Sequence, residues 1–402
     1  MSRDIGIGAP VQEKGVTPLY VPEIRGNEWK YIKECLDTGW VSSAGPFVDR
    51  FEQEFARFVG SEFAVSAVNG TAALHMALLV AGVASGDEVL VSALTFIAPA
   101  NAIRYVGAWP VFIDAEPEYW QMDPAKVVDF LEQKCVWRGK ELGLYNRITG
   151  RRVKAILPVH ILGHPVDLDP MLEVAQKYGL AVIEDATESL GAKYKNRMVG
   201  TLGDIACFSF NGNKIITTGG GGMIVTNNEA WARKAKYLTT QAKDDPFEYV
   251  HNEIGYNYRL TNLQAAMGCA QLEQLPRFLE SKQQIAATYS ELLKHLPGLK
   301  LMQAAPWAFS TFWLYTVLID SAESATDSRS VSRALDQAGI QTRPLWQPLH
   351  LSPALRDSYH YVCPIAEELN RDALSLPSSV GLSQDDLHTV TSMIRRILNR
   401  GF

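Results

Sequence analysis

The chain has 402 residues, of which 47% are hydrophobic and 20% are charged. This is an ordinary globular composition, and the length exceeds the size at which a single hydrophobic core usually stops growing, so we expect two domains. Because 44 acidic residues outnumber 38 basic ones, giving a net charge of −6, the composition does not support a nucleic-acid partner.

The five cysteines are scattered along the chain without the spacing of metal ligands. We interpret them as mostly buried, reduced thiols, predict no metal site, and expect a cytoplasmic protein. The first residues, Met1–Asp4, are polar, and no run of about 18 apolar residues occurs in the sequence, so we expect neither a signal peptide nor a membrane span.

The predicted elements start with two helices and then alternate between strands and helices. In chain order they are helix 27–37, helix 47–59, strand 63–68, helix 70–82, strand 88–92, helix 99–105, strand 109–114, helix 124–134, strand 153–159, helix 170–178 and strand 181–185. This alternation predicts an α/β fold with a mostly parallel sheet and helices on both faces. A short basic segment between residues 135 and 152 interrupts it, which we interpret as a surface hairpin.

The pattern changes after residue 222. We predict helix 229–241, a long helix 262–296 with a kink or break at Pro276, strand 313–319, helix 330–338 and helix 384–399. The predicted organisation is a large α/β domain, residues 1–250, and a smaller C-terminal domain, residues 251–402, with the long helix as the connection.

Lys214 lies on a loop between two predicted buried strands, shortly before four consecutive glycines, Gly219–Gly222. A glycine run costs backbone entropy and indicates positive φ angles or a close approach to a ligand, although a flexible loop with a solvated lysine explains this stretch alone equally well. Upstream, Asp185 ends an apolar strand at the edge where open α/β sheets bind ligands, so the two side chains can face one cleft. The competing role for Asp185 is the N-cap of a following helix.

Asn69–Ala72 turns a strand directly into a helix, where backbone N–H groups at the positive end of the helix dipole suit a phosphate. Ser209 can add a hydroxyl, and ordinary capping is the alternative for both. The sequence contains neither a P-loop nor a dinucleotide-binding glycine motif. A lysine, a buried carboxylate, a phosphate cradle and an aromatic lid such as Phe96 are what pyridoxal phosphate requires together, although an isolated aromatic residue more often belongs to a core.

With these motifs the chain resembles the DegT/DnrJ/StrS group of sugar-nucleotide aminotransferases, which are pyridoxal phosphate enzymes of fold type I. The resemblance covers essentially the whole chain through motifs in consistent order: Gly39–Pro46, Asn69–Leu74, Leu94–Phe96, Pro158–His160, Glu184–Ala186, Ser209–Gly222 and Gly255–Arg259. It implies a mostly parallel central sheet flanked by helices, with a smaller C-terminal α+β domain.

The resemblance also implies roles for individual residues. Lys214 is the implied catalytic lysine, and the implied cofactor-binding residues are Thr71, Ala72 and Ser209 at the phosphate, Phe96 over the ring, Asp185 at the pyridinium nitrogen, Glu188 near the phenolic oxygen and Asn257. Glu188 stands where much of the family has histidine or glutamine, and the glycine run lacks an acidic residue that is common there. Asn257 would reach the phosphate of the neighbouring subunit, which implies a homodimer; a turn asparagine is the alternative.

The implied reaction transfers an amino group from L-glutamate to a nucleotide-linked keto sugar. Related dehydratases have histidine in place of the lysine, so Lys214 favours transamination. The 184–189 motif is most similar to enzymes of the bacillosamine and legionaminic acid type, which implies a UDP-4-keto-6-deoxy-N-acetylhexosamine and a 4-amino sugar for surface glycans.

Candidate substrate contacts are Trp40, Ser42, Arg343 and His350, with a packed domain junction as the alternative for the last two. Other functions remain open from the residues alone: amination at C3, a different lyase or transferase reaction with the same cofactor, or a non-catalytic regulator with this fold.

Overall fold

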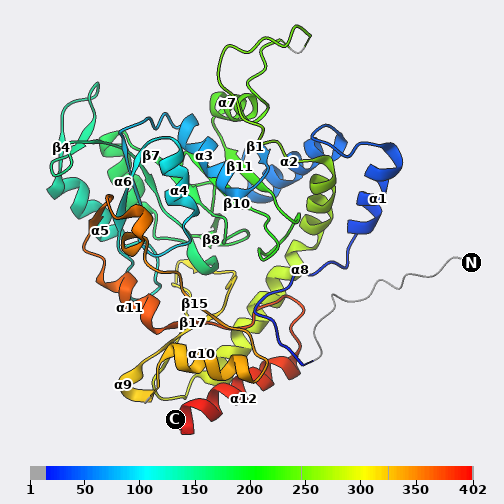
Figure 1. The fold of residues 1–402 in the computed structure, drawn as a ribbon, viewed down its shortest axis with the longest axis vertical. Coiled ribbons are helices and arrows are strands. Elements are labelled where there is room, and N and C mark those ends of the chain that lie inside the picture. The colour runs from blue at the N-terminus through cyan, green and yellow to red at the C-terminus, as the bar shows by residue number, and fades with distance from the viewer. Residues whose placement is uncertain (1–14, 246, 325, 401–402) are drawn as a thin grey trace, which may run out of the picture.

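The computed structural model describes residues 15–245, 247–324 and 326–400. The expectation for Met1–Asp4 therefore lies outside the described residues. A large central sheet is covered by helices, and a smaller sheet with its own helices lies at the end of the molecule that carries the C-terminus (Figure 1).

The central sheet has ten strands and is mostly parallel, which confirms the predicted α/β class. Its main path is β1 (Phe63–Ala67), β11 (Gly222–Thr226), β10 (Ile205–Ser209), β7 (Ala181–Asp185), β6 (Arg152–Leu157), β2 (Glu88–Ser92), β3 (Trp109–Ile113) and β16 (Tyr359–Tyr361). From β10 to β16 every neighbouring pair is parallel, whereas β11 is antiparallel to both of its neighbours. The predicted surface hairpin is formed by β4 (Cys135–Trp137) and β5 (Leu144–Asn146), and β5 pairs with the start of β6.

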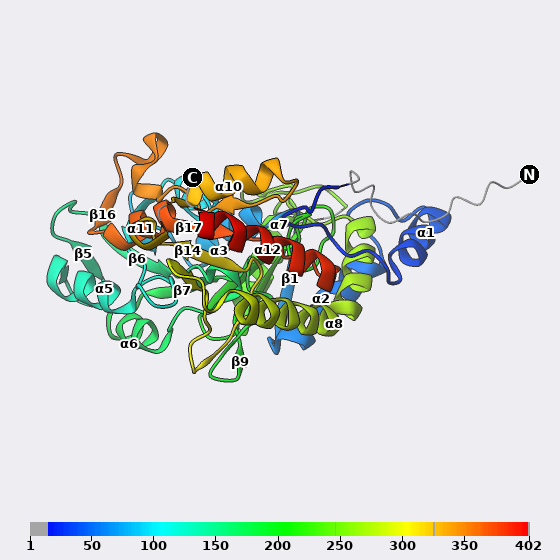
Figure 2. The same ribbon diagram turned by 90° about the horizontal axis from the view of Figure 1, so that it is seen from below.

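Helices cover both faces of this sheet because successive strand residues point to opposite sides. In β10, Cys207 belongs to the core under one set of helices and Phe208 to the core under the other. The first set is α3 (Gly70–Val80), α4 (Ala98–Tyr105) and α7 (Glu229–Thr239); the second is α2 (Pro46–Val59), α5 (Pro124–Asp129), α6 (Asp169–Tyr178) and the first half of α8 (Asn262–Leu293). Figure 2 shows α5, α6 and α8 together on one side of the strands.

The smaller sheet is antiparallel, in the order β12 (Leu299–Leu301), β14 (Thr316–Ile319), β17 (Ala373–Ser375) and β15 (Arg343–Pro344). It shares a separate core with α10 (Ser328–Gln337), α12 (Gln384–Arg400) and the second half of α8. The remaining elements are α1 (Glu28–Thr38), α9 (Ser321–Ser324), α11 (Pro364–Asp372) and a three-stranded sheet of β13 (Ala308–Phe309), β8 (Lys193–Tyr194) and β9 (Arg197–Met198). The division at residue 250 stays a prediction.

Three predicted elements differ from the structure. α8 starts at a capping box formed by Thr261 and Gln264 and continues through Pro276 as one helix, so of the predicted kink or break the structure excludes the break. The helix predicted over 124–134 is α5 followed by a π-helical turn, Phe130–Lys134. β14 starts at Thr316 rather than at residue 313, because the preceding backbone bonds to residues 162–163 instead of to a neighbouring strand.

All five cysteines are buried and unpaired, as expected for reduced thiols. Among the helices that the structure describes, none combines the length and apolar character needed to cross a membrane.

Candidate active site

Lys214 lies on the loop that joins β10 to β11, as the sequence indicated. β10 pairs in parallel with β7, and Cys207 lies opposite Asp185 in the register. The loop that carries Lys214 and the end of β7 therefore leave the sheet at the same edge, which is the edge where parallel α/β sheets bind ligands.

The amine of Lys214 lies between a carboxylate and an aromatic ring. Its Nζ is 3.4 Å from Oε1 of Glu188 and 4.0 Å from the centroid of the Trp313 ring. The two charged side chains are only 13% and 4% exposed, so both the ion pair and the cation–π contact are shielded from water. Trp313 was not among the predicted site residues, since a tryptophan beside an apolar strand reads as core.

The backbone around Lys214 is held by two further side chains. The indole N–H of Trp313 donates to the carbonyl of Asn213 at 2.7 Å, and the hydroxyl of Tyr20 donates to the carbonyl of Lys214 at 3.0 Å. Tyr20 comes from the N-terminal segment, which no sequence pattern connects with the lysine loop. These bonds fix the peptide on either side of the lysine.

Leu162 connects the two partners of the Lys214 amine. Its N–H donates to Oε2 of Glu188 at 3.0 Å, and its carbonyl accepts from the N–H of Trp313 at 3.0 Å. Leu162 adopts φ +58, which is unusual for a residue with a side chain. A Cβ on the next residue, Gly163, would lie 2.2 Å from Oγ1 of Thr311, so only glycine fits this close approach. One tight turn thus positions both Glu188 and Trp313.

Asp185 is buried at the end of β7 and accepts the N–H of Thr187 at 3.1 Å. The residues after it form turns, so the alternative role as a helix N-cap does not apply. Burial raises the pKa of Asp185, although the Thr187 hydrogen bonds and the charge of Lys214 oppose the rise. Burial raises the pKa of Glu188 as well, again opposed by Lys214. Both carboxylates lie where a cationic partner is favourable.

The start of α3 is the helix N-terminus at which the sequence predicts a phosphate site, and one of its amides already has a partner. Oδ1 of the N-cap Asn69 accepts the N–H of Ala72 at 2.8 Å, so this amide already has a protein partner, and the helix start leaves the N–H groups of Gly70 and Thr71 without intrahelical bonds. A Cβ on Gly70 would lie 2.9 Å from Cβ of Ser209. The Ser209 hydroxyl and the positive end of α3 are therefore adjacent.

Phe96 follows β2 at the same edge of the sheet and is 56% exposed, so it is not a core residue.

Trp40 and Ser42 lie in an exposed loop that is bonded to the start of α8. Asn262 donates its side-chain amide to the Trp40 carbonyl at 2.8 Å and its backbone N–H to the Ser42 carbonyl at 2.6 Å. Asn257 is exposed and pairs through its backbone with Thr240.

The last two predicted substrate contacts lie in other parts of the fold. Arg343 is exposed on β15 of the smaller sheet and donates to the carbonyl of Thr342 at 2.9 Å. Nε2 of His350 is 3.0 Å from Oε1 of Glu367, and its ring stacks on His360 of β16, five strands beyond β10. These contacts place His350 against Glu367 and His360, and its role as a substrate contact stays a prediction.

Glu184 is a supporting residue that sequence analysis did not assign. It is fully buried and accepts N–H groups from Gly200, Leu202 and Gly203 at 2.8, 2.8 and 2.6 Å, as well as Nε2 of His160 at 3.0 Å. Because Nδ1 of His160 accepts the N–H of Val166, the proton of its neutral ring is on Nε2. Burial by itself raises the pKa of Glu184, but these hydrogen bonds outweigh it and the pKa lies below its ordinary value.

A lysine on a loop at the sheet edge, a buried aspartate and a hydroxyl beside a helix N-terminus are the features of a pyridoxal phosphate-dependent transferase. The chain belongs to the DegT/DnrJ/EryC1/StrS aminotransferase family, whose model matches residues 22–395. It is thus a keto-sugar aminotransferase of a family that uses pyridoxal phosphate.

Named relatives agree with this membership. The chain is 40% identical to the GDP-perosamine synthase of Caulobacter vibrioides over 94% of this chain and 97% of that protein, and 40% identical to the GDP-perosamine synthase of Escherichia coli O157:H7 over 92% and 95%. Among solved structures, S. venezuelae DesV in complex with a ketimine intermediate is 31% identical to this chain. It superposes with a TM-score of 0.83 over 93% of this chain and 95% of that chain.

Replacing Glu184 by glutamine is expected to lower the free energy of unfolding by about 3 kcal/mol at pH 7, because an amide N–H then faces buried donors. The ionised carboxylate stabilises the fold above its ordinary pKa, and this contribution is lost as the pH falls through the lower pKa of the folded state. The difference in the free energy of unfolding between wild type and Glu184→Gln should therefore become smaller at acid pH. Urea unfolding at several pH values measures this difference, and Glu132→Gln, at an exposed position, is the control. A difference that stays constant with pH would contradict the stabilising role of the ionised Glu184 carboxylate.

Proposed function

We propose that this chain aminates C4 of a nucleotide-linked 4-keto-6-deoxy sugar, with L-glutamate as the amino donor and Lys214 as the catalytic lysine. The observation that carries the proposal is the position of the Lys214 amine, held against Glu188 and Trp313 at the edge of β7 and β10. The product would be a 4-amino sugar for surface glycan synthesis.

The residues present fit pyridoxal phosphate. Ser209 and the N–H groups at the start of α3 offer a hydroxyl and a positive helix end to the phosphate. Asp185 is a buried carboxylate that gains from a protonated ring nitrogen, because an opposite charge offsets its desolvation. Phe96 offers an exposed ring for stacking. When bound, the cofactor supplies an electron sink for the substrate carbon.

The amine of Lys214 acts as the general base and acid of the reaction in this proposal. Its Nζ takes the proton from the donor carbon and returns one to the acceptor carbon. Glu188 keeps Nζ in place and, because burial raises its pKa, can share a proton with it. The indole of Trp313 covers the amine and excludes water from it. The two functions of Lys214, proton transfer and cofactor attachment, thus need the same fixed position.

The sugar nucleotide is the finer part of the proposal. Two relatives at 40% identity are named GDP-perosamine synthase, and perosamine is a 4-amino sugar, which supports a GDP-linked acceptor. The 184–189 motif favours a UDP-linked N-acetylhexosamine instead. Both acceptors share the 4-keto-6-deoxy ring and a diphosphate, and Trp40, Ser42 and Arg343 are the candidate contacts for them.

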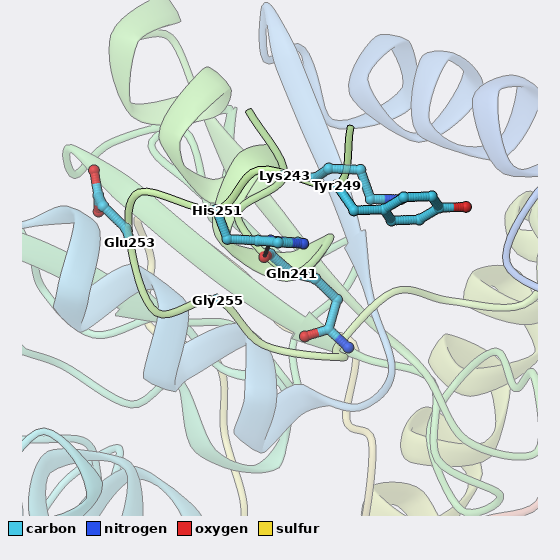
Figure 3. A pocket seen from close by; sticks show the side chains of 6 residues that line it. All are labelled: Gln241, Lys243, Tyr249, His251, Glu253 and Gly255. Carbon is cyan, nitrogen blue, oxygen red and sulfur yellow. Dashed lines mark hydrogen bonds between the residues drawn. The ribbon is translucent and has the colours of Figure 1, made fainter. Parts of the chain in front are cut away.

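A homodimer completes the proposed site. A segment projects from the molecule after α7 (Figure 1), and Asn257 pairs through its backbone with Thr240, the residue after α7. Phe247 and Ile254 on this segment are 84% and 85% exposed, which is unusual for large apolar side chains and favours a covering partner. A hollow of about 490 Å³ within the segment is lined by Gln241, Lys243, Tyr249, His251, Glu253 and Gly255 (Figure 3).

The protein loaded with pyridoxal phosphate should show a visible absorption band that L-glutamate bleaches. Lys214→Ala should lack the band and lose about 10³-fold or more in amination rate, within the range for removal of a general acid–base group. Lys195→Ala is the control, because Lys195 is exposed and paired only at the surface. A persistent band in Lys214→Ala would show that another group binds the cofactor.

Steady-state kinetics with a panel of keto-sugar nucleotides identify the acceptor. We expect kcat/KM for a GDP-4-keto-6-deoxyhexose to exceed that for UDP-4-keto-6-deoxy-N-acetylhexosamine by at least about tenfold, a ratio that the loss or gain of a few contacts provides. NMR of the product should place the amine on C4. An amine on C3, or no turnover with any keto sugar, would contradict the proposal.

Mixing inactive variants tests the shared site. If Asn257 completes the partner's site, a mixture of Lys214→Ala and Asn257→Ala subunits should regain about a quarter of the wild-type rate, since half of randomly paired dimers carry one intact site. The mixture is assayed after dissociation and reassociation of the subunits, with each variant alone as the control. No recovery would show that Asn257 serves its own subunit.

A further inference from the structure

Lys282 is a buried amine that the proposed reaction does not use. It lies in α8 and is 1% exposed, and within the described part of the chain no carboxylate forms an ion pair with it. Its Nζ donates to the carbonyls of Trp313 at 2.7 Å and Ser378 at 2.5 Å and lies 5.5 Å from the centroid of the Tyr20 ring. Burial lowers its pKa to about 7. Burying an amine in this way is costly, so the arrangement calls for a reason.

The two carbonyls explain why a donor is needed at this position. Trp313 lies just before β14 and Ser378 just after β17, so neither carbonyl is part of a strand ladder. Buried carbonyls outside secondary structure need another donor. The long side chain of Lys282 reaches both and joins two segments that enter and leave the smaller sheet.

The three groups around the Lys282 amine all lead to Lys214. The ring of Trp313 contacts the Lys214 amine, and its indole N–H donates to the carbonyl of Asn213, the residue before Lys214. Tyr20 donates to the carbonyl of Lys214 itself. The N–H of Ser378 donates to the carbonyl of Leu19, which holds the segment that carries Tyr20. Lys282 therefore contacts both Trp313 and Tyr20, the two residues whose side chains fix the lysine loop.

We propose that Lys282 is a positioning residue for Lys214, which it holds in place through Trp313 and Tyr20. The inference rests on the proposed catalytic role of Lys214, but the position of the Lys214 amine is measurable without turnover. Loss of the Lys282 amine frees the Trp313 and Ser378 carbonyls, and the indole and the Tyr20 hydroxyl then no longer hold the lysine loop in one conformation.

The test compares Lys282→Met with Tyr289→Phe. Tyr289 is a matched control because it also lies on α8 and donates from a buried position to a carbonyl of the same segment, Pro377, at 2.8 Å, without contacting Trp313. Apoprotein is labelled with trinitrobenzenesulfonate, and mass spectrometry compares Lys214 with the exposed Lys140. In Lys282→Met the relative labelling of Lys214 should rise about fivefold, the effect of losing one ordinary hydrogen bond on the population of an open loop.

Tyr289→Phe should leave Lys214 labelling at the wild-type value, even if it lowers the melting temperature as much as Lys282→Met does. Equal labelling of Lys214 in the two variants would overturn the proposal and leave Lys282 a purely structural residue. Because the apoprotein is labelled, this result does not depend on whether the chain aminates a sugar. A failure of the amination assay alone would instead count against the proposed function.

If Lys282→Met does not fold, Lys282→Arg decides the question through pH. The titratable groups that face the Lys282 amine are Tyr20 and, across Trp313, the Lys214–Glu188 pair. As the pH rises through about 7, Lys282 loses its charge and its hydrogen bonds weaken, whereas arginine stays charged. Lys214 labelling in wild type should then rise above that in Lys282→Arg. Superimposable pH profiles would refute the positioning role.

Discussion

The site depends on one tight turn, in which Leu162 binds Glu188 through its N–H and Trp313 through its carbonyl. Each of these partners contacts the same amine, so the position of Lys214 is determined from two sides by a single residue. The turn is rigid because Leu162 has a positive φ and Gly163 leaves no room for a side chain. A flexible lysine is therefore held by backbone geometry rather than by its own rotamer preference.

Three acidic residues close together in the chain have different surroundings, and this separates their roles. Glu184 accepts four donors and has a lowered pKa, so its charge is satisfied within the protein. Asp185 and Glu188 are buried with fewer donors, and burial raises the pKa of each. Alternation along β7 accounts for the difference between Glu184 and Asp185, since neighbouring residues of a strand face opposite sides of the sheet, whereas Glu188 lies in the turn that follows the strand. The residue with a satisfied charge supports the backbone, and those with raised pKa values face the lysine.

Local sequence patterns predicted the parts of the site that depend on nearby residues. The ends of β7 and β10, the helix start after Asn69 and the loop with Lys214 are each visible as an apolar run followed by glycine or polar residues, and the class of fold follows from their alternation. The sequence also indicates that Asn69 caps the helix, since asparagine is a common N-cap. Its side chain accepts the Ala72 N–H, which therefore competes with the phosphate role predicted for the same N–H. The resemblance to a known family supplied the residue roles.

Contacts between distant segments were not predictable in this way. Tyr20, Leu162 and Trp313 reach Lys214 from three separate parts of the chain, and none belongs to a motif with a fixed spacing. The surroundings of His350 were not predictable either: its ring stacks on His360 of β16, at the end of the central sheet, and its role as a substrate contact stays a prediction. Chain order alone does not give the distance between two loops that follow different strands of a ten-stranded sheet.

The segment from Thr311 to Trp313 connects the two sheets without being a strand of either. Its N–H groups bond the 162–163 turn at the edge of the central sheet, and a few residues later the same chain enters β14 of the smaller sheet. A rotation of the smaller sheet would therefore pull on Trp313, and through its indole on the backbone of the lysine loop. Because the Lys282 amine bonds the Trp313 carbonyl from α8, this coupling has a third fixed point on the helix that spans both cores. The position of the Lys214 amine at the edge of the larger sheet thus depends on how the smaller sheet is packed.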